Sequence, residues 1–325
     1  MRILGTGSYV PDRVLSNFDL EKTLDTTNEW IHQRTGILER RVAAEDQASS
    51  DLAHHASLHA LDAAGIDKSE LDLVIFATIT PDMCCPAAAN FLQAKLDIPR
   101  ALTFDVSAAC SGFIFALNVA QQYLKSRAAK TVLVVASEVM TRTVDWTDRS
   151  SCILWGDGAA AVVLRRDPGG PQLLSSHVHT DGANGMNLLL PGGGSLTTPI
   201  GHRSVDEKRH FLRLIAANTT VRVAVKHFAD SCYEALEANH VSIEDIDWVI
   251  PHQANLRMLQ SLAKRIELPM EKMVLTIEKY GNISSASVAI ALDEAVRDGR
   301  IRKDHLALLT AFGGGLTWGS ALIRW

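Results

Sequence analysis

The sequence predicts an α/β protein made of two similar halves, and three observations support this fold class. Short apolar runs such as DLVIFATIT (72–80), TVLVVASE (131–138) and AAAVVLRR (159–166) are typical of strands covered on both faces. Helical patterns such as SGFIFALNVAQQYLKSR lie between them, which favours a largely parallel sheet. The second half of the chain then repeats the order of the first.

The repetition is visible in three pairs of segments. Residues 72–75 match 247–250, an offset of 175 residues (247 minus 72). The segments AKTVLVVASE and GDGAAAVVL have counterparts, in the same order, in DHLALLTAFG and TWGSALIRW. Apolar strands can resemble one another by chance, but three ordered matches favour an internal duplication. We predict halves at residues 1–168 and 169–325, joined near the loop-rich RRDPGGPQ.

Composition and charge exclude several classes of protein. The 325 residues are 47% hydrophobic and carry a net charge of −5, without the basic excess of nucleic-acid or membrane-surface proteins. No apolar run approaches the length of a spanning helix, and the N-terminus does not have the pattern of a signal peptide. The five cysteines form no zinc-like pairs and are expected to be reduced thiols. We therefore expect a cytoplasmic protein that binds neither nucleic acid nor membrane.

One segment fits neither helix nor strand. Residues 182–210 are rich in Gly and Pro and are long for a loop in a compact domain. Loops of this length are more often functional covers than spacers. We expect this segment to cover part of a site.

Cys110 is the first candidate for chemistry. It follows the strand-like FDV and a turn of small residues, and it precedes a helical pattern. Backbone N–H groups and the helix dipole at such a position stabilise a thiolate, so we expect a lowered thiol pKa. A free cysteine is most commonly a core residue, and we give this structural role to Cys84, Cys152 and Cys232.

Three further junctions could supply partners for this thiol. His252 follows the strand WVI, at the kind of position where α/β proteins place site residues. Asn282 lies between Gly281 and the next helical pattern, although an isolated Asn is more often a turn residue. The glycine loop in AFGGGLTWGS could present N–H groups to a developing oxyanion.

A papain-like protease is the rival interpretation of Cys, His and Asn in this order. His252 and Asn282 follow Cys110 by 142 and 172 residues (252 minus 110, 282 minus 110), close to the roughly 130–150 residues of that family. The protease signature around the cysteine is absent, because CSGF stands in its place. We reject the protease on this ground.

Several blocks of the sequence strongly resemble the β-ketoacyl-acyl carrier protein synthase III family, the initiating condensing enzymes of type II fatty acid synthesis. These blocks are TNEWIHQRTGI, AACSGF, DRSSCILWGDGAA, PHQANLR, YGNISSAS and GGGLTWGSALIRW. The resemblance runs from Ile3 to the last residue. It implies a thiolase-like fold, with two duplicated α/β halves in five αβαβα layers, and a homodimer.

The resemblance also implies the roles of individual residues. Cys110 would be the acylated nucleophile, His252 and Asn282 would complete the catalytic triad, and the backbone N–H groups of Cys110 and Gly314 would form the oxyanion hole. Elongating condensing enzymes carry a second His in place of Asn282, which favours the initiating class. The implied reaction condenses an acyl-CoA primer with malonyl-acyl carrier protein, and it needs no metal or redox cofactor.

Further positions are assigned to substrate contacts by the same resemblance. Trp30 and Arg149 would hold the CoA adenine, Arg34 would contact phosphate or pantetheine, and Asn255 would contact the pantetheine arm. A basic face for the acidic carrier protein would consist of Arg222, Arg257, Lys264 and Arg265. Without the family, each of these charges would be an ordinary solvated surface charge.

The chain departs from the family at Cys85, where some members carry an aromatic residue that closes the acyl pocket across the dimer. A smaller residue leaves more volume, so we expect a primer longer than acetyl to be accepted. The sequence leaves two alternatives open. One is a relative in a specialised pathway with a non-acetyl starter, and the other is a non-catalytic acyl-binding homologue.

Overall fold

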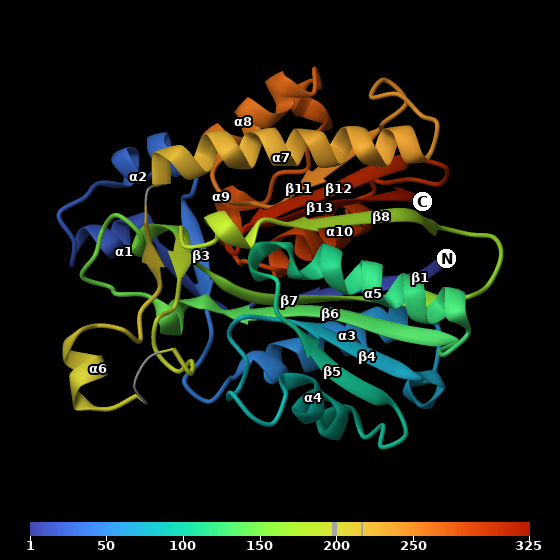
Figure 1. The fold of residues 1–325 in the computed structure, drawn as a ribbon, viewed down its shortest axis with the longest axis horizontal. Coiled ribbons are helices and arrows are strands. Elements are labelled where there is room, and N and C mark those ends of the chain that lie inside the picture. Colours follow the sequence, from blue (N-terminus) through green and yellow to red (C-terminus); the bar gives the residue numbers. More distant parts are fainter. Residues whose placement is uncertain (197–199, 216) are drawn as a thin grey trace.

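Nine strands form one sheet that divides into two parts at its middle (Figure 1). The structure is a computed structural model that describes residues 1–196, 200–215 and 217–325, without the side chains of 217–222. The first part contains β1 (Arg2–Tyr9), β7 (Asp157–Arg165), β6 (Thr131–Val139), β4 (Leu73–Ala77) and β5 (Leu102–Val106). The second part contains β8 (Gln172–Thr180), β13 (Thr317–Arg324), β12 (Leu306–Gly313) and β11 (Trp248–Pro251). A single residue pair, Arg2 with Gln172, joins β1 to β8.

The two parts repeat one pattern of strand pairing. In the first, β4 pairs with β6 in parallel and β6 pairs with β7 antiparallel. In the second, β11 pairs with β12 in parallel and β12 pairs with β13 antiparallel. The strands predicted from the matched segments are therefore present in the predicted order, while the boundary between residues 168 and 169 stays a prediction.

The prediction of a largely parallel sheet is wrong. The β4–β5, β4–β6 and β11–β12 pairs are parallel, but β1, β7, β8 and β13 pair antiparallel with all their neighbours. The short connection between Gly313 and Thr317 shows the reason, because a chain that reverses in a tight turn must return antiparallel.

Helices complete five layers, as the family resemblance implies (Figure 1). Between the two parts of the sheet lie α5 (Gly112–Ser126) and α10 (Ala286–Arg297). One outer face is covered by α3 (Ser49–Ala64) and α4 (Ala88–Leu96), and the other by α7 (Ala217–Ala238) and α8 (Leu256–Arg265). Strands β4 and β6 are buried along their whole length, which explains why β4 and the first part of β6 after Thr131 are continuously apolar.

Glycines in β1 allow α3 to pack directly on the sheet. A Cβ atom at Gly5 would lie 2.4 Å from the Ala64 nitrogen, and one at Gly7 would lie 2.3 Å from the Ala60 nitrogen. Only glycine permits so close an approach of helix backbone to strand backbone. The two glycines therefore let α3 lie directly on β1.

Short elements surround the ends of the strands. They are α1 (Asn17–Glu21), α2 (Asn28–Thr35), α6 (His202–Asp206), α9 (Ile277–Tyr280), β2 (Arg13–Ser16), β3 (Glu39–Val42), β9 (Leu188–Leu189) and β10 (Arg213–Leu214). Segment 182–210 therefore contains the short strand β9 and the short helix α6, so the prediction that it has neither is wrong. The β9 strand is stabilised by pairing with β10, a contact distant in sequence. Among the described residues, no helix is both long and apolar enough to span a bilayer.

Candidate active site

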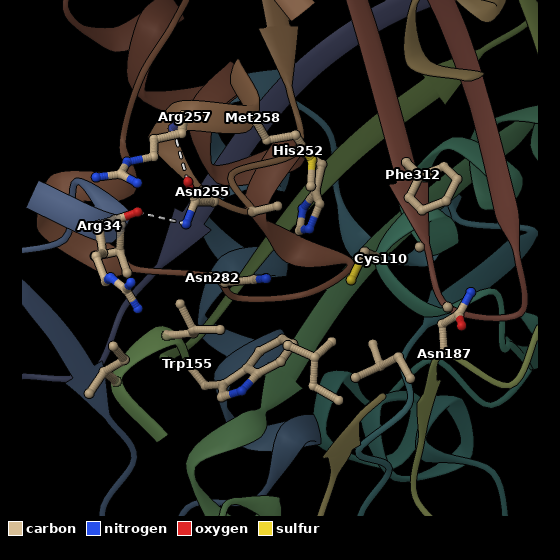
Figure 2. A pocket seen from close by; sticks show the side chains of 18 of the residues that line it. Arg34, Cys110, Trp155, Asn187, His252, Asn255, Arg257, Met258, Asn282 and Phe312 are labelled. Carbon is tan, nitrogen blue, oxygen red and sulfur yellow. Dashed lines mark hydrogen bonds between the residues drawn. The ribbon is translucent and has the colours of Figure 1, made fainter. Parts of the chain in front are cut away.

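A cavity of about 680 Å³ opens where the two halves meet. Its wall contains Cys110 from the first half and His252 and Asn282 from the second. Figure 2 shows these three side chains pointing toward one another, with Trp155 and Phe312 beside them. The structure thus brings together the three residues that the sequence selected as chemical candidates.

Cys110 lies in the tight turn between β5 and α5. The preceding Ala109 adopts a left-handed φ of +46°, which turns the chain sharply before the helix begins at Gly112. Only 4% of the Cys110 surface is exposed. Burial raises the pKa of the Cys110 thiol to about 12, so the expected lowering of this pKa is wrong. The physical reason is desolvation, which disfavours the thiolate more than the local donors stabilise it.

His252 follows β11 directly and is almost fully buried. Its backbone N–H donates to the Thr310 carbonyl of β12 at 2.8 Å, which continues the sheet pairing to this residue. Burial lowers the pKa of His252 to about 3, because the cation would lose its hydration. Within the described chain, Nδ1 has no hydrogen-bond partner. The imidazole is therefore neutral at physiological pH.

Asn282 is fixed by the backbone of a neighbouring segment. Its N–H donates to the Leu154 carbonyl at 2.8 Å, and its carbonyl accepts from Gly156 N–H at 3.1 Å. The side-chain Oδ1 accepts from Ser284 N–H at 2.8 Å. Since the amide oxygen is occupied, the amide NH₂ group is the part that faces the cavity (Figure 2).

Glycines at the end of β12 complete the wall beside the thiol. A Cβ at Gly313 would lie 2.7 Å from the Cys110 nitrogen, so glycine is required for this close approach of two backbones. Gly314 lines the same cavity and packs against Leu188. Backbone N–H groups can therefore be offered to a substrate oxygen from both chain segments.

The mouth of the cavity carries an aromatic ring between two cationic side chains. The Arg34 guanidinium carbon lies 4.8 Å from the centre of the Trp30 ring, and that of Arg149 lies 5.3 Å from it. Arg149 also donates to the Asp25 backbone carbonyl and forms an ion pair with its carboxylate. Such a flat, positively charged surface suits a nucleotide with its phosphates.

Helix α8 begins at the same opening. Asn255 caps it by accepting from Arg257 N–H at 2.9 Å, and its Nδ2 donates to the Arg34 carbonyl at 3.0 Å (Figure 2). Arg257, Lys264 and Arg265 are exposed, while the opposite face of the helix is buried. The predicted basic face is therefore solvent-accessible beside the mouth, except for Arg222, whose side chain lies outside the described residues.

Comparison with known proteins identifies the family. Two family models match the chain. The model described as 3-Oxoacyl-[acyl-carrier-protein (ACP)] synthase III matches residues 104–182, and the model described as 3-Oxoacyl-[acyl-carrier-protein (ACP)] synthase III C terminal matches residues 236–325. A beta-ketoacyl-[acyl-carrier-protein] synthase III of Xanthomonas campestris is 50% identical over 100% of this chain and 98% of its own length. The chain belongs to the 3-oxoacyl-[acyl-carrier-protein] synthase III family.

Other relatives of this synthase III chain agree. The homologue of Alkalilimnicola ehrlichii is 48% identical over 100% of this chain and 99% of its own. The synthase III structure from Aquifex aeolicus is 42% identical, with a TM-score of 0.91 over 100% of this chain and 99% of that one. The priming beta-ketosynthase of the R1128 polyketide pathway is 37% identical, with a TM-score of 0.90 over 99% and 96%. The predicted family and thiolase-like fold are confirmed.

Apolar residues of the cavity were missed by the sequence analysis. They include Trp155, Leu188, Met258, Phe312 and Leu316. Trp155 stands in the family block DRSSCILWGDGAA, so the sequence marked this segment. That the Trp155 side chain points into the cavity depends on tertiary structure, which the sequence does not show. Leu188 belongs to segment 182–210, whose expected position over a site agrees with this lining.

Cys85 lies elsewhere. It is exposed, and the residues that line the cavity of this chain do not include it. Cys84 is exposed as well, because it lies in the same surface loop, so the core role expected for it is wrong, whereas Cys152 and Cys232 are buried as expected. Its expected position in the acyl pocket of a partner subunit stays a prediction. In the part of the chain that the structure describes, no three His, Cys, Asp or Glu side chains are grouped so as to hold a metal ion.

Proposed function

We propose that this synthase III condenses an acyl-CoA primer with malonyl-acyl carrier protein to give 3-oxoacyl-acyl carrier protein. The observation that carries the proposal is the convergence of Cys110, His252 and Asn282 in one cavity with backbone donors beside the thiol. This reaction initiates type II fatty acid synthesis. The thiol of Cys110 is protonated at rest and His252 is neutral, and the reaction starts from these states.

In the first step, Cys110 attacks the thioester carbon of the acyl-CoA. The thiol is protonated at rest, so it loses its proton as the sulfur–carbon bond forms, and the departing CoA sulfur takes a proton up. His252, whose pKa burial lowers to about 3, keeps its neutral Nε2–H form throughout. Backbone N–H groups of Cys110 and Gly314 stabilise the tetrahedral oxyanion. CoA then leaves as its thiol, and an acyl-Cys110 thioester remains.

In the second step, malonyl-acyl carrier protein enters and loses CO₂. The electron pair of the broken bond gives an enolate whose oxygen needs neutral donors. The His252 Nε2–H and the Asn282 amide meet this need, since neither presents an acidic carboxyl that could quench the carbanion. The carbanion attacks the acyl carbonyl, Cys110 leaves with the electron pair of the carbon–sulfur bond, and its sulfur takes up a proton from solvent as the 3-oxoacyl product forms. Neither thioester exchange nor decarboxylative condensation is a redox reaction, so the sequence of steps needs no metal or redox cofactor.

The mouth of the cavity suits the two carriers. Trp30 and Arg149 would hold the adenine of CoA, with Arg34 near the phosphates or pantetheine. Asn255 uses both ends of its amide in capping α8 and contacting Arg34, so its contact to pantetheine would be added to a structural task. The basic face of Arg257, Lys264 and Arg265, with Arg222, would bind the acidic carrier protein.

We further propose a cytoplasmic homodimer. Strand β5 lies at the edge of the sheet, and its Leu102 side chain is 54% exposed. An apolar edge strand in a soluble protein needs a cover, and a second copy of β5 supplies one. In this arrangement the neighbouring loop with Cys85 can reach the acyl pocket of the partner, and its small side chain leaves room for a primer longer than acetyl.

The experiment that tests the function is acylation without a malonyl donor. The protein is incubated with acetyl-CoA and with butyryl- to octanoyl-CoA, and peptide masses locate the acyl group. We expect a thioester on Cys110 in the wild type and in a Cys84→Ser control, but none in Cys110→Ser. Labelling by none of the acyl-CoAs would refute the initiating synthase, and labelling by acetyl-CoA alone would refute the proposal for Cys85.

A further inference from the structure

Arg40 is a fully buried arginine in β3 that has no task in the reaction above. All hydrogen bonds that the described structure gives its guanidinium go to neutral oxygens. These are the Leu15 carbonyl at 3.0 Å, Asn17 Oδ1 at 3.0 Å and the Ile153 carbonyl at 2.8 Å. A buried cation among neutral partners costs free energy that an apolar side chain of similar volume would avoid. The segments that these bonds hold together must therefore offset this cost.

Two of the three acceptors belong to segments that are themselves held in place. Leu15 is the register partner of Arg40 in the antiparallel pair of β2 and β3. Asn17 is fully buried, and its Nδ2 donates to the Ile37 carbonyl at 2.7 Å. The guanidinium therefore extends from a fixed frame toward its third acceptor.

The third acceptor belongs to the segment that pairs with Asn282. Ile153, Leu154 and Trp155 all line the cavity. Trp155 forms a parallel bridge with Asn282. The Leu154 carbonyl accepts from Asn282 N–H at 2.8 Å, and Gly156 N–H donates to the Asn282 carbonyl at 3.1 Å. The guanidinium therefore holds Ile153, the residue directly before this pairing begins.

The Arg40 side chain also packs against both chain segments of this pairing. A Cβ at Gly156 would lie 3.1 Å from the Arg40 Cβ and 2.3 Å from the Tyr280 carbonyl oxygen. A Cβ at Gly281, the residue before Asn282, would lie 3.6 Å from the Arg40 Cβ. Glycine at these two positions permits the close approach of the backbones and of the arginine side chain. A change at Arg40 therefore reaches the turn before Asn282 by packing as well as by hydrogen bonding.

We propose that Arg40 is a positioning residue, whose three hydrogen bonds fix segment 153–156 and thereby direct the Asn282 amide into the cavity. Arg40 is not among the described residues that line the cavity, so it acts through Asn282 and not on the substrate. The catalytic consequence rests on the proposed function, in which Asn282 donates to the enolate and has no task in acylation. Loss of the three hydrogen bonds should therefore slow condensation and leave acylation of Cys110 intact.

The test compares wild type with Arg40→Met and Arg40→Lys. Methionine fills much of the same space without a donor, and lysine keeps the charge but cannot reproduce the fork of the guanidinium. Thr6→Val is the matched control, because it removes a buried hydroxyl that donates to Asp293 at 2.7 Å instead of to segment 153–156. Amide hydrogen exchange is followed by mass in the peptides that contain Gly156 and Asn282. Acylation by acyl-CoA and condensation with malonyl-acyl carrier protein are then measured as separate steps.

We expect exchange in both peptides to be about tenfold faster in Arg40→Met and unchanged in Thr6→Val, as for loss of a hydrogen bond to a charged group. The kcat of condensation should fall about 100-fold in Arg40→Met, the size of effect that a misplaced catalytic group produces. The KM for malonyl-acyl carrier protein should change little, and acylation should stay within about twofold of wild type. Arg40→Lys should lie between wild type and Arg40→Met in each measurement.

Unchanged exchange in the Arg40 variants, or an equal loss of acylation and condensation, would overturn the proposal. The same changes in Thr6→Val would overturn it as well, because they would show a general effect of lost stability. If the methionine variant does not fold, the lysine variant alone decides by the same measurements. Hydrogen exchange needs neither acyl-CoA nor malonyl donor, so it tests the positioning even if wild type makes no product, a result that would refute the proposed function.

Discussion

The two halves of the molecule use the same scaffold and place different chemistry at equivalent points. Helices α5 and α10 both enter the central layer, and their first turns meet, since a Cβ at Gly112 would lie 3.1 Å from the Ser285 Cβ. In the first half, Cys110 lies between the end of β5 and the first turn of α5. In the second half, the segment that corresponds to β5 pairs with β11 only through a single bridge between Val249 and Met273. Asn282 follows this segment and precedes the first turn of α10. A duplicated frame can thus deliver a nucleophile from one copy and hydrogen-bond donors from the other.

The tasks of the two halves are distinguished best by a variant that loses a hydrogen-bond donor of the second half and keeps the Cys110 nucleophile of the first. Asn282→Asp keeps the oxygen that accepts from Ser284 N–H but loses the amide donor. We expect condensation to fall about 100- to 1,000-fold, as for loss of one oxyanion donor. Acylation of Cys110 should continue at a similar rate, because Asn282 has no task in that step.

The measurement combines stopped assays of 3-oxoacyl product with intact mass of the enzyme. Accumulation of acyl-enzyme without product is the expected result. If acylation and condensation fell together, the division of tasks between the halves would be wrong.

A second prediction concerns the buried imidazole of the second half. Burial lowers the pKa of His252 to about 3 from an ordinary value of 6.5. Below pH 6.5 the unfolded chain therefore binds a proton that the folded protein does not. Above pH 6.5 neither state binds this proton, and the protein has its full stability. As the pH falls from 6.5 toward 3, proton binding to the unfolded chain lowers the stability of the folded protein. The free energy of unfolding should decrease by up to ~1.4 kcal/mol per pH unit in this window.

Urea unfolding between these pH values checks the prediction in wild type, His252→Gln and the exposed control His202→Gln. The glutamine at position 252 should make the pH dependence shallower by up to one proton, whereas the control should keep the wild-type slope. Equal slopes in all three proteins would show that His252 is protonated in the folded state.

The contact between the halves gives a smaller effect. A Cβ at Gly112 would lie 3.1 Å from the Ser285 Cβ and 3.2 Å from the Ala77 Cβ, so Gly112→Ala must force the first turns of α5 and α10 apart. We expect a destabilisation of about 1–3 kcal/mol from this overpacking. Gly182→Ala, where nothing lies within 4 Å, should leave stability nearly unchanged. Chemical denaturation measures both, and a neutral Gly112→Ala would mean that this interface can relax.

The smallest effect belongs to the carrier-protein face of the second half. Lys264→Glu should raise the KM for malonyl-acyl carrier protein by about fivefold at low salt, the size typical of one exposed charge pair. The change should shrink with added salt, and acylation by acyl-CoA should not alter. Lys303→Glu makes the same charge change outside α8 and serves as the control. An equal rise in KM for both variants would show a general charge effect instead of docking.

Much of this architecture could be predicted from the sequence, because buried strands have a local pattern. The strands β4, β6 and β7 each contain an apolar run, and so do their counterparts β11, β12 and β13 in the second half. Strand direction was harder, since it depends on the length and path of the connections. The two-residue strand β9 has no pattern of its own and depends on a partner distant in sequence.

The site was predictable in position and less so in its electrostatics. Cys110, His252 and Asn282 each stand at a junction that local sequence marks, and the structure places all three on one cavity. The acidity of the thiol was not predictable, because burial outweighs the helix terminus and burial is a tertiary property.

The high pKa of the Cys110 thiol also affects how this enzyme withstands oxidants. Because burial holds the pKa of this thiol far above neutrality, very few molecules carry a thiolate at neutral pH. Peroxides attack the thiolate, so the idle enzyme is protected from inactivation between turnovers. Cys84, which is exposed, is expected to react before the buried Cys110. Resistance of the resting thiol to oxidation is thus an expected result of the same desolvation that makes the resting nucleophile inert.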